Sequence, residues 1–168
     1  MSRKLALVAV LAMCITGAGL AADFDKLPDT MKNAVAGQWV RYSVIGGLTQ
    51  RHTITALEGK GEEARVTVQT ETFQDGKNVD TETQKMPLGA YRDMQVSALL
   101  EDPDTRITDV KIPVGGREYD AVLIEYTNPN YDQPTKIWMS EKVPVTGILR
   151  MTVGDEAEPI LELIDFGD

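Results

Sequence analysis

The chain has 168 residues, of which 26 are acidic and 17 basic, and its formal net charge at pH 7 is −9. An acidic surface repels nucleic acid and anionic lipid headgroups, so neither is expected as a partner, whereas cations or a basic protein suit the charge. One cysteine, Cys14, and one histidine, His52, cannot form an internal disulfide or a zinc site built on histidines.

The first 22 residues have the pattern of a secretory signal peptide. Two basic residues, Arg3 and Lys4, precede an apolar run over residues 5–15, and small residues follow up to Ala22. In such a segment the basic end stays in the cytoplasm, the apolar part enters the bilayer, and the peptidase cuts after small side chains. We therefore expect cleavage after Ala21 or Ala22, and a bacterial protein that is periplasmic or secreted.

Two other interpretations of this segment stay open. A retained membrane anchor needs about 20 apolar residues, which is more than this run provides. A lipid anchor on Cys14 fits the short run Leu11-Ala12-Met13-Cys14, although bacterial lipoproteins carry a small residue where Met13 stands. After cleavage, residues 23–168 would retain 15 of the 17 basic residues and all 26 acidic ones, a net charge of −11, in a single domain with no cysteine and no membrane span.

The segment that follows the expected signal peptide predicts a helix over residues 23–36. Its apolar residues recur at helical spacing and would share one face. They are Phe24, Leu27, Met31 and Val35. Pro28 suits the first turn of a helix, and Gly37 suits the left-handed position that follows the last turn.

From residue 38 onward the pattern predicts strands. Nine segments combine β-branched or aromatic residues with alternation, and turn residues separate them. They are residues 38–45, 50–57, 64–73, 79–86, 107–114, 118–127, 135–140, 147–153 and 160–166. Asp75-Gly76 is the strongest hairpin signal in the chain. Residues 87–105 interrupt the alternation, and a short amphipathic helix near residues 88–101 is favoured there over an ordered loop.

These elements predict a mainly β fold, formally α+β, with an antiparallel meander of about 8–10 strands and an N-terminal helix. The crossover helices of a parallel sheet are absent from the pattern. A sheet this wide has to curl, so it becomes a half-barrel, a barrel or a sandwich.

No catalytic or metal-binding pattern accompanies these strands. His52 stands alone, and no serine has the Gly-x-Ser-x-Gly context of a hydrolase. Acidic pairs such as Glu62-Glu63 fall in expected turns and lack the spacing of a calcium loop. We therefore expect no enzyme activity, no cofactor and no metal, with a carboxylate-based hydrolase as the least favoured alternative.

Residues 135–150 carry a resemblance to a known family. Trp138 lies in mid-strand, a turn with Val143-Pro144 follows, and Gly147 opens the next strand. Together with the signal, the helix and the long meander, this order resembles the exported lipoprotein carriers of the LolA/LolB-like superfamily. The resemblance implies an incomplete barrel, helices over its open side and an apolar cavity for acyl chains. The arginine of that cavity would correspond to Arg41 or Arg65.

The function expected from these features is the binding of a lipid or other hydrophobic molecule in the concave face of a curved sheet. The residues proposed for this site are Trp39, Tyr42, Tyr91, Met94, Trp138 and Met151. Met86, Met94, Met139 and Met151 add deformable apolar surface. Further apolar strand residues could line the same face, although all of them would equally fill an ordinary core. They are Val40, Val44, Val66, Val68, Val122, Ile124 and Leu149. The alternative is an envelope protein that binds another protein through a sheet edge or its acidic face.

Overall fold

The computed structural model describes residues 23–60, 63–91, 99, 102–128, 133–154 and 158–168. Nine strands make up one antiparallel sheet, so the predicted mainly β class is confirmed. The strands are β1 (Trp39–Val44), β2 (Leu48–Glu58), β3 (Arg65–Gln74), β4 (Lys77–Pro87), β5 (Arg106–Val114), β6 (Arg117–Asn128), β7 (Gln133–Met139), β8 (Ile148–Val153) and β9 (Leu161–Gly167).

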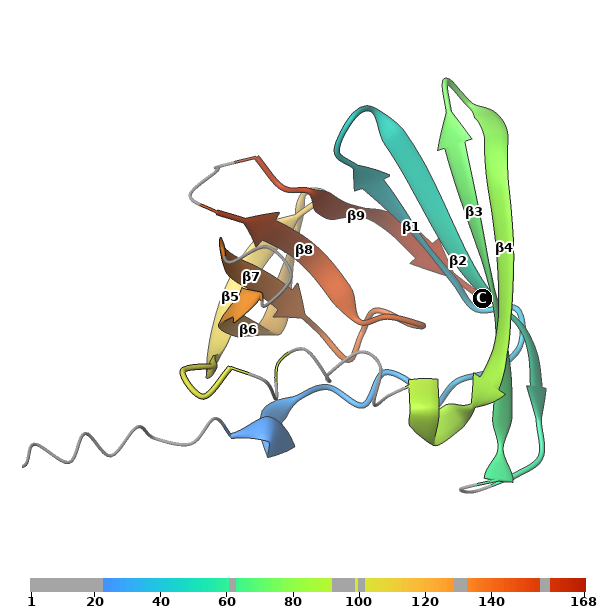
Figure 1. Cartoon of the computed structure of the whole chain (residues 1–168), viewed down its shortest axis with the longest axis horizontal. Coiled ribbons are helices and arrows are strands. Elements are labelled where there is room, and N and C mark those ends of the chain that lie inside the picture. Colours follow the sequence, from blue (N-terminus) through green and yellow to red (C-terminus); the bar gives the residue numbers. More distant parts are fainter. Residues whose placement is uncertain (1–22, 61–62, 92–98, 100–101, 129–132, 155–157) are drawn as a thin grey trace, which may run out of the picture.

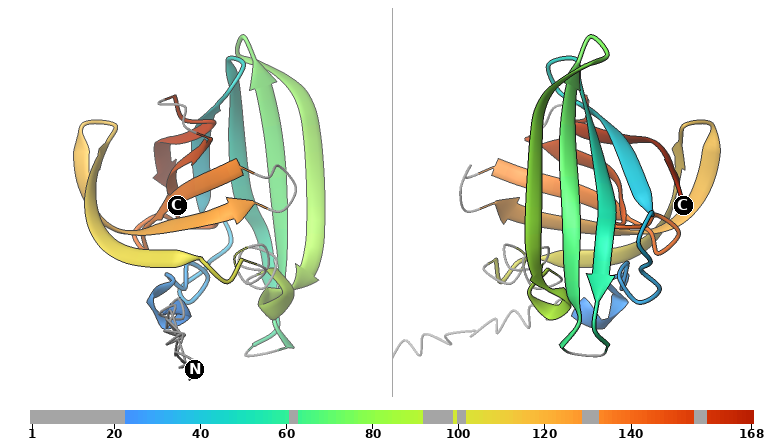
Figure 2. Two further views of the ribbon diagram at one scale, coloured as in Figure 1. Left: turned by 60° about the vertical axis from the view of Figure 1, so that its left-hand side comes forward. Right: turned by 90° about the vertical axis from the view of Figure 1, so that its right-hand side faces the viewer.

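The strand order is β4-β3-β2-β1-β9-β8-β7-β6-β5, which leaves the sheet open between β4 and β5. Consecutive strands are neighbours except at that one break, and the last strand, β9, pairs with the first, β1. The sheet is strongly bent: β1–β4 form one wall, and β5–β9 form the other (Figure 1). Figure 2 shows the same bend from two further sides. The sheet is curved but is not a closed barrel.

Local turn chemistry places the hairpins where the sequence predicts them. Asp75 and Gly76 have φ values of 51° and 76°, and they are the only two residues between β3 and β4. Positive φ at both central positions is the type I′ geometry that matches the twist of a two-stranded ribbon. Gly115 and Gly116, with φ of 57° and 76°, join β5 to β6 in the same way.

The predicted helix over residues 23–36 is wrong. Only a 3₁₀ turn, η1 (Phe24–Lys26), forms, and Leu27 has an extended backbone with ψ of 131°. The cause is Pro28, because a proline disfavours the helical conformation of the residue before it. The chain then turns again, and the side chain of Asp29 accepts a hydrogen bond from the backbone N–H of Met31.

The predicted short helix near residues 88–101 begins where expected. Residues 88–91 are helical, and so is Leu99. The other positions of this segment lie outside the described residues, as does the predicted signal peptide. In the described part of the chain, no helix is long and apolar enough to cross a bilayer.

Buried side chains form two clusters. The larger one joins β1, β2, β3, β9 and the distal ends of β5 and β6, with Val40, Tyr42, Ile54, Val66, Leu163, Ile112 and Tyr119 among its members. The smaller one lies where β6 and β7 meet the N-terminal segment and Leu99, and contains Ile124, Tyr126, Ile137 and Met139, with Phe24 and Leu27 packed against it.

The β5–β6 hairpin changes its buried face halfway along its length. Ile124 and Tyr126 belong to the smaller cluster, whereas Tyr119 and Ala121 belong to the larger one. Side chains alternate between the two faces of a strand, so these two pairs lie on opposite faces of β6. The ladder between β5 and β6 runs without a bulge. The twist of the hairpin therefore produces the change.

Candidate ligand-binding cleft

Two of the six predicted site residues, Tyr42 and Tyr91, lie together in the larger core cluster. The Tyr42 side chain is fully buried, and Tyr91 is 5 % exposed. The Tyr42 hydroxyl donates to the carbonyl of Ile148 at 2.9 Å and is hydrogen-bonded to the hydroxyl of Thr146. Burial raises the pKa of Tyr42 well above its usual value. Its place is that of a neutral anchor inside the core.

Tyr42 anchors the turn that follows β7, inside the segment that carries the family resemblance. The N–H of Thr146 donates to the carbonyl of Pro144 at 2.8 Å, and Val145 between them has φ of 67°. Positive φ is unfavourable for a β-branched residue. The Thr30 hydroxyl donates to the Val145 carbonyl at 3.3 Å. Tyr42 and Thr30 thus both form hydrogen bonds with this turn, and the turn contributes to the packing of the core.

Trp39 lies on the face of β1 opposite to Tyr42, because the two residues are three positions apart in one strand. The guanidinium carbon of Arg51 lies 4.6 Å from the centre of the Trp39 ring, a cation–π contact. The backbone of Gly167 covers the indole as well: a Cβ there would lie 3.2 Å from it. Trp39 is therefore occupied by contacts within the protein.

Trp138 and Met151 also lie on opposite faces of the sheet. Met151 is the partner of Ile137 in the β7–β8 ladder, so the neighbouring Trp138 points the other way. Met94 lies outside the described residues. Trp138 packs against the larger cluster, which contains Tyr42 and Tyr91, whereas Met151 packs against the smaller one. The structure therefore brings three of the predicted residues together at one cluster and leaves Trp39 and Met151 apart from it. Of the two arginines, Arg41 forms a bidentate pair with Asp165, its Nε and Nη2 lying 2.8 and 2.6 Å from the two carboxylate oxygens.

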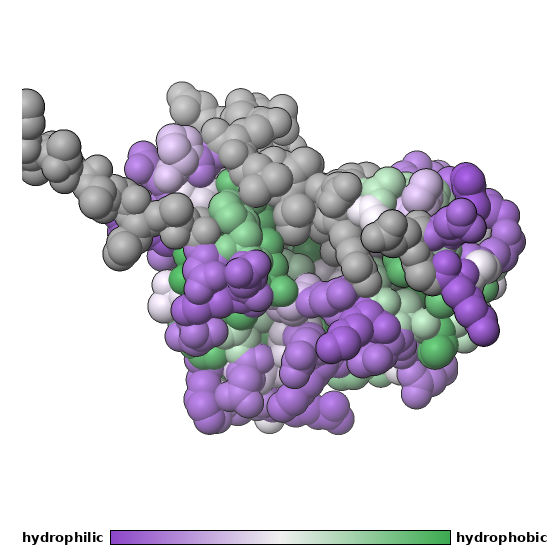
Figure 3. Space-filling model, turned by 90° about the horizontal axis from the view of Figure 1, so that it is seen from below, coloured by the Kyte–Doolittle hydropathy of each residue, from purple (hydrophilic) through white to green (hydrophobic). Residues whose placement is uncertain are grey.

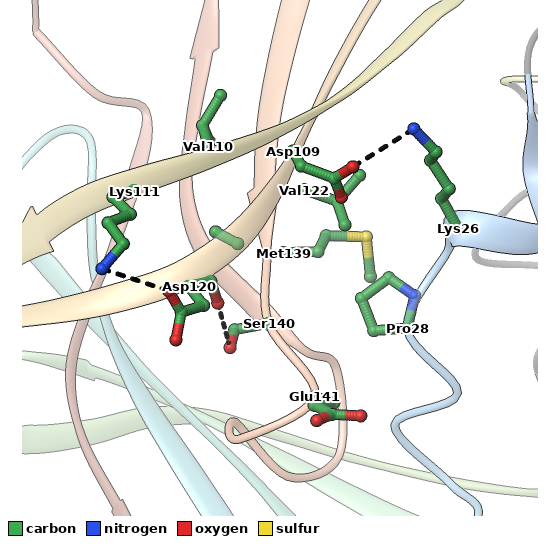
Figure 4. Close-up of a pocket in the computed structure, with 11 residues that line it drawn as sticks. Lys26, Pro28, Asp109, Val110, Lys111, Asp120, Val122, Met139, Ser140 and Glu141 are labelled. Carbon is green, nitrogen blue, oxygen red and sulfur yellow. Dashed lines mark hydrogen bonds and ion pairs between the residues drawn. The ribbon is translucent and has the colours of Figure 1, made fainter.

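A cleft of about 470 Å³ lies beside the place where the β5–β6 hairpin changes its buried face (Figure 4). None of the predicted site residues that the structure describes contributes to it. Its lining comes from the N-terminal segment, β5, β6, and the end of β7 with the two residues after it. The residues are Lys26, Pro28, Asp109, Val110, Lys111, Asp120, Ala121, Val122, Met139, Ser140 and Glu141.

The floor of the cleft is apolar because one face of the sheet is incompletely covered there. Val122 of β6 pairs with Asp109 of β5 and with Met139 of β7, so the three side chains share a face. Ile124, two residues further along this face, is completely buried in the smaller cluster. Pro28 of the N-terminal segment lines the cleft next to this cluster, and Val122 is partly exposed. Figure 3 shows hydrophobic side chains flanked by hydrophilic ones on the underside of the molecule.

The rim of the cleft is charged, and each of its two ammonium groups has a carboxylate partner. The Nζ atom of Lys26 lies 3.2 Å from Asp109. The Nζ atom of Lys111 lies 3.3 Å from Glu118 and 3.7 Å from Asp120. Hydrogen bonding to Glu118, reinforced by the charges of both carboxylates, raises the pKa of Lys111. The rim therefore presents ammonium groups whose charge is already balanced.

The carboxylates of the rim are less completely paired. Asp120 is held only by long contacts, 3.7 Å to Lys111 and 3.8 Å to Lys142. Glu141 is exposed, and its carboxylate has no hydrogen bond or ion pair within the described ranges. Ser140 is fixed between them, since its hydroxyl donates to the Asp120 carbonyl at 2.8 Å. The cleft thus combines an apolar floor with a rim that has spare negative charge.

The described part of the chain has no cluster of side chains suited to metal binding. No group of three or more His, Cys, Asp or Glu side chains there could hold a metal ion. His52 lies on the inner face of β2, where its Nδ1 is 3.1 Å from the Thr70 hydroxyl and its ring meets the edge of Tyr42 at 5.8 Å. Burial lowers the pKa of His52, so the ring is neutral at neutral pH.

Comparison with known proteins gives no match: no family model, no curated protein and no solved structure is similar to this chain. The resemblance to the lipoprotein carriers therefore rests on residues 135–150 and the order of elements, and it stays a prediction.

Proposed function

We propose that the protein binds a small amphipathic molecule, with the apolar part on the floor of the cleft and the polar part at its rim. The observation that carries this proposal is the volume and lining of the cleft. About 470 Å³ lies within the range of about 300–1,000 Å³ that is typical of small-molecule sites. An apolar floor with a few polar groups is also the usual composition of such sites.

The proposal moves the ligand of the sequence prediction to another part of the same concave sheet. Val122 and Met139 lie on the face that Ile124 and Ile137 bury, so a ligand there would extend the smaller cluster. The thioether of Met139 suits an apolar group of irregular shape. The signal-like first 22 residues support a periplasmic or secreted protein, in which a carrier or sensor of amphipathic molecules is a sensible role.

Nuclear magnetic resonance of the methionine methyl groups tests this site directly. Met139 lies in the cleft, whereas Met31 is buried in the larger cluster and Met86 packs against it. On addition of octyl glucoside below its micelle concentration, we expect the Met139 signal to shift in a saturable way and the other two to stay in place.

A substitution that fills the cleft gives the matched control. Val122→Trp should abolish the shift of Met139, whereas Val79→Trp, at an exposed position of β4, should leave it unchanged. Thermal unfolding of both variants shows whether they remain folded. If Met139 does not respond to the probe in the native protein, the proposed site is wrong.

A second candidate function rests on the free edge of the sheet. Every residue of β4 except Met86 is exposed, and the outer edge of β4 has no partner strand within the sheet. Such an edge can accept a strand from another protein. Asp80 and Glu82 share the inner face of β4, while Lys85 lies on the outer face, so two copies pairing antiparallel would oppose acid to acid. A partner strand with basic residues on the inner face suits the edge better.

A photo-crosslinking residue distinguishes this second candidate. Placed at Thr83 in the full chain, it should capture one protein from an envelope extract, and Glu82→Lys should prevent the capture. Capture that persists in Glu82→Lys, or that is equally efficient from Asp109 of β5, would argue against strand addition at β4.

A further inference from the structure

We infer that the cleft selects cationic amphipathic ligands, whose ammonium or guanidinium group pairs with Glu141 and Asp120. This inference rests on the proposed function and adds the chemical class of the ligand.

The lining of the cleft, the lining together with its nearest charged partners, and the whole chain each have a net negative charge. Two lysines and three carboxylates line it, which leaves one excess negative charge. Including the two nearest partners, Glu118 and Lys142, does not change that excess. The whole chain has a net charge of −9. A ligand cation therefore approaches through an attractive field, and a ligand anion through a repulsive one.

The contacts of the individual groups point the same way. An anionic headgroup would have to take Lys26 from Asp109 at 3.2 Å, or Lys111 from Glu118 at 3.3 Å. A cationic headgroup meets Glu141, which has no partner in the described residues, and Asp120, whose two contacts exceed 3.5 Å. Pairing with the cation thus breaks no close ion pair.

The geometry allows one molecule to use both parts of the site. Met139, Ser140 and Glu141 are consecutive, so the apolar floor and the free carboxylate belong to one short stretch of chain. Glu141 lies on one side of the cleft and the Lys26–Asp109 pair on the other (Figure 4). Glu141 also borders an adjoining cleft of about 380 Å³, lined by Asp29, Lys32 and Phe166 among others. The carboxylate is therefore reached from two sides.

Three probes with the same chain and different headgroups test the inference. Octylammonium, octyl glucoside and octanoate are titrated into the full chain, each below its micelle concentration, with the Met139 methyl signal as the readout. We expect octylammonium to bind about fivefold more tightly than octyl glucoside, and octanoate to bind most weakly. High salt should remove the advantage of octylammonium and leave octyl glucoside unaffected, because it screens exposed charges.

Two variants with the same change in net charge locate the effect. Glu141→Gln should remove most of the preference for octylammonium, whereas Glu82→Gln, on exposed β4, should retain it. The preference is the ratio of the octylammonium and octyl glucoside affinities within each variant, so an effect of the substitution on both probes cancels. Glu82 lies outside the cleft lining, so Glu82→Gln should bind octyl glucoside as the native chain does.

The outcomes separate the inference from the function on which it rests. If no probe shifts the Met139 signal, the proposed function is wrong. Equal binding of octylammonium and octyl glucoside, or tighter binding of octanoate, overturns the selectivity and leaves the cleft as a site. An equal loss of preference in Glu141→Gln and Glu82→Gln overturns it too, because the net charge alone would then explain the effect.

Discussion

The two hairpins at the ends of the sheet form by the same local rules but differ in how much of their surface is buried. β3–β4 and β5–β6 are both long, and two residues with positive φ join the strands of each. Yet β4 is exposed along nearly its whole length, whereas β5–β6 buries apolar residues first on one face and then on the other. Turn chemistry determines that a hairpin forms, but side-chain composition determines what covers it.

The contrast explains where open space remains. On β4 the polar inner face that Asp80, Glu82 and Gln84 form is exposed, and among the described residues the outer edge has no partner strand. Beside β5–β6 the N-terminal segment packs against the cluster that contains Ile124 and leaves Val122 partly exposed, so a cleft remains there. One end of the sheet thus supports the protein-binding hypothesis, and the other supports the small-molecule hypothesis.

The largest effect should come from removing an apolar side chain at the covered end. Ile124 is fully buried, so Ile124→Ala should lower the free energy of unfolding by about 2–5 kcal/mol. Val79 of β4 is 56 % exposed, and Val79→Ala should change the free energy by less than about 0.5 kcal/mol. Urea unfolding of the two variants measures the contrast. Similar losses in both would mean that the two hairpins are equally buried.

The next effect concerns Tyr42, which lies in β1, the strand of the first wall that pairs with β9 of the second. Tyr42→Phe retains the ring and removes the hydroxyl, so the Ile148 carbonyl and the Thr146 hydroxyl each lose a hydrogen bond. We expect a loss of about 1–2 kcal/mol of stability, measured by urea unfolding. A variant as stable as the native chain would show that these bonds contribute nothing net.

Much of this fold is predictable from the sequence because the relevant signals are local. All nine strands lie where alternation and turn residues predict them, and Asp75-Gly76 forms the expected turn. The prediction of an N-terminal helix was wrong for an equally local reason, since Pro28 disfavours the helical conformation at Leu27. The pairing of β1 with β9 could not be predicted from local signals, because these strands lie at opposite ends of the domain.

The candidate cleft was less predictable for the same reason. Lys26 and Asp109 are 83 residues apart in the sequence, and only the tertiary fold brings them to one rim. Val122 and Met139 are two of many apolar residues in the sequence that could line a cavity or fill a core, and no local signal distinguishes them. The aromatic residues of the predicted site are candidates because of their side-chain type, and the type of a side chain does not determine which face of the sheet it lies on. The alternation of side chains already places Trp39 and Tyr42 on opposite faces of one strand.

Acid should weaken the β1–β4 wall through His52. Burial lowers its pKa in the folded state, so the unfolded chain, with a pKa of about 6.5, binds a proton that the folded chain does not. The stability that the neutral ring contributes is therefore present above pH 6.5, and it decreases as the pH falls below that value.

Unfolding measured between pH 7 and pH 5 should show this decrease in the native chain and not in His52→Gln. Glu58 and Asp102 also have lowered pKa values, through Lys85 and through the backbone N–H of Thr127 respectively, but they lose their contribution at lower pH. A decrease that persists in His52→Gln would assign the effect to other groups.

The smallest effect is expected on the outer face of β4. The Nζ atom of Lys85 lies 2.8 Å from Glu58, and both side chains are about half exposed. An ion pair in water gains little, because the solvent screens it and two mobile side chains have to be ordered. Lys85→Ala should therefore leave the urea midpoint of unfolding unchanged within error. A clear loss would show that charges on this edge stabilise the wall, and apolar burial alone would then not account for the difference between the two hairpins.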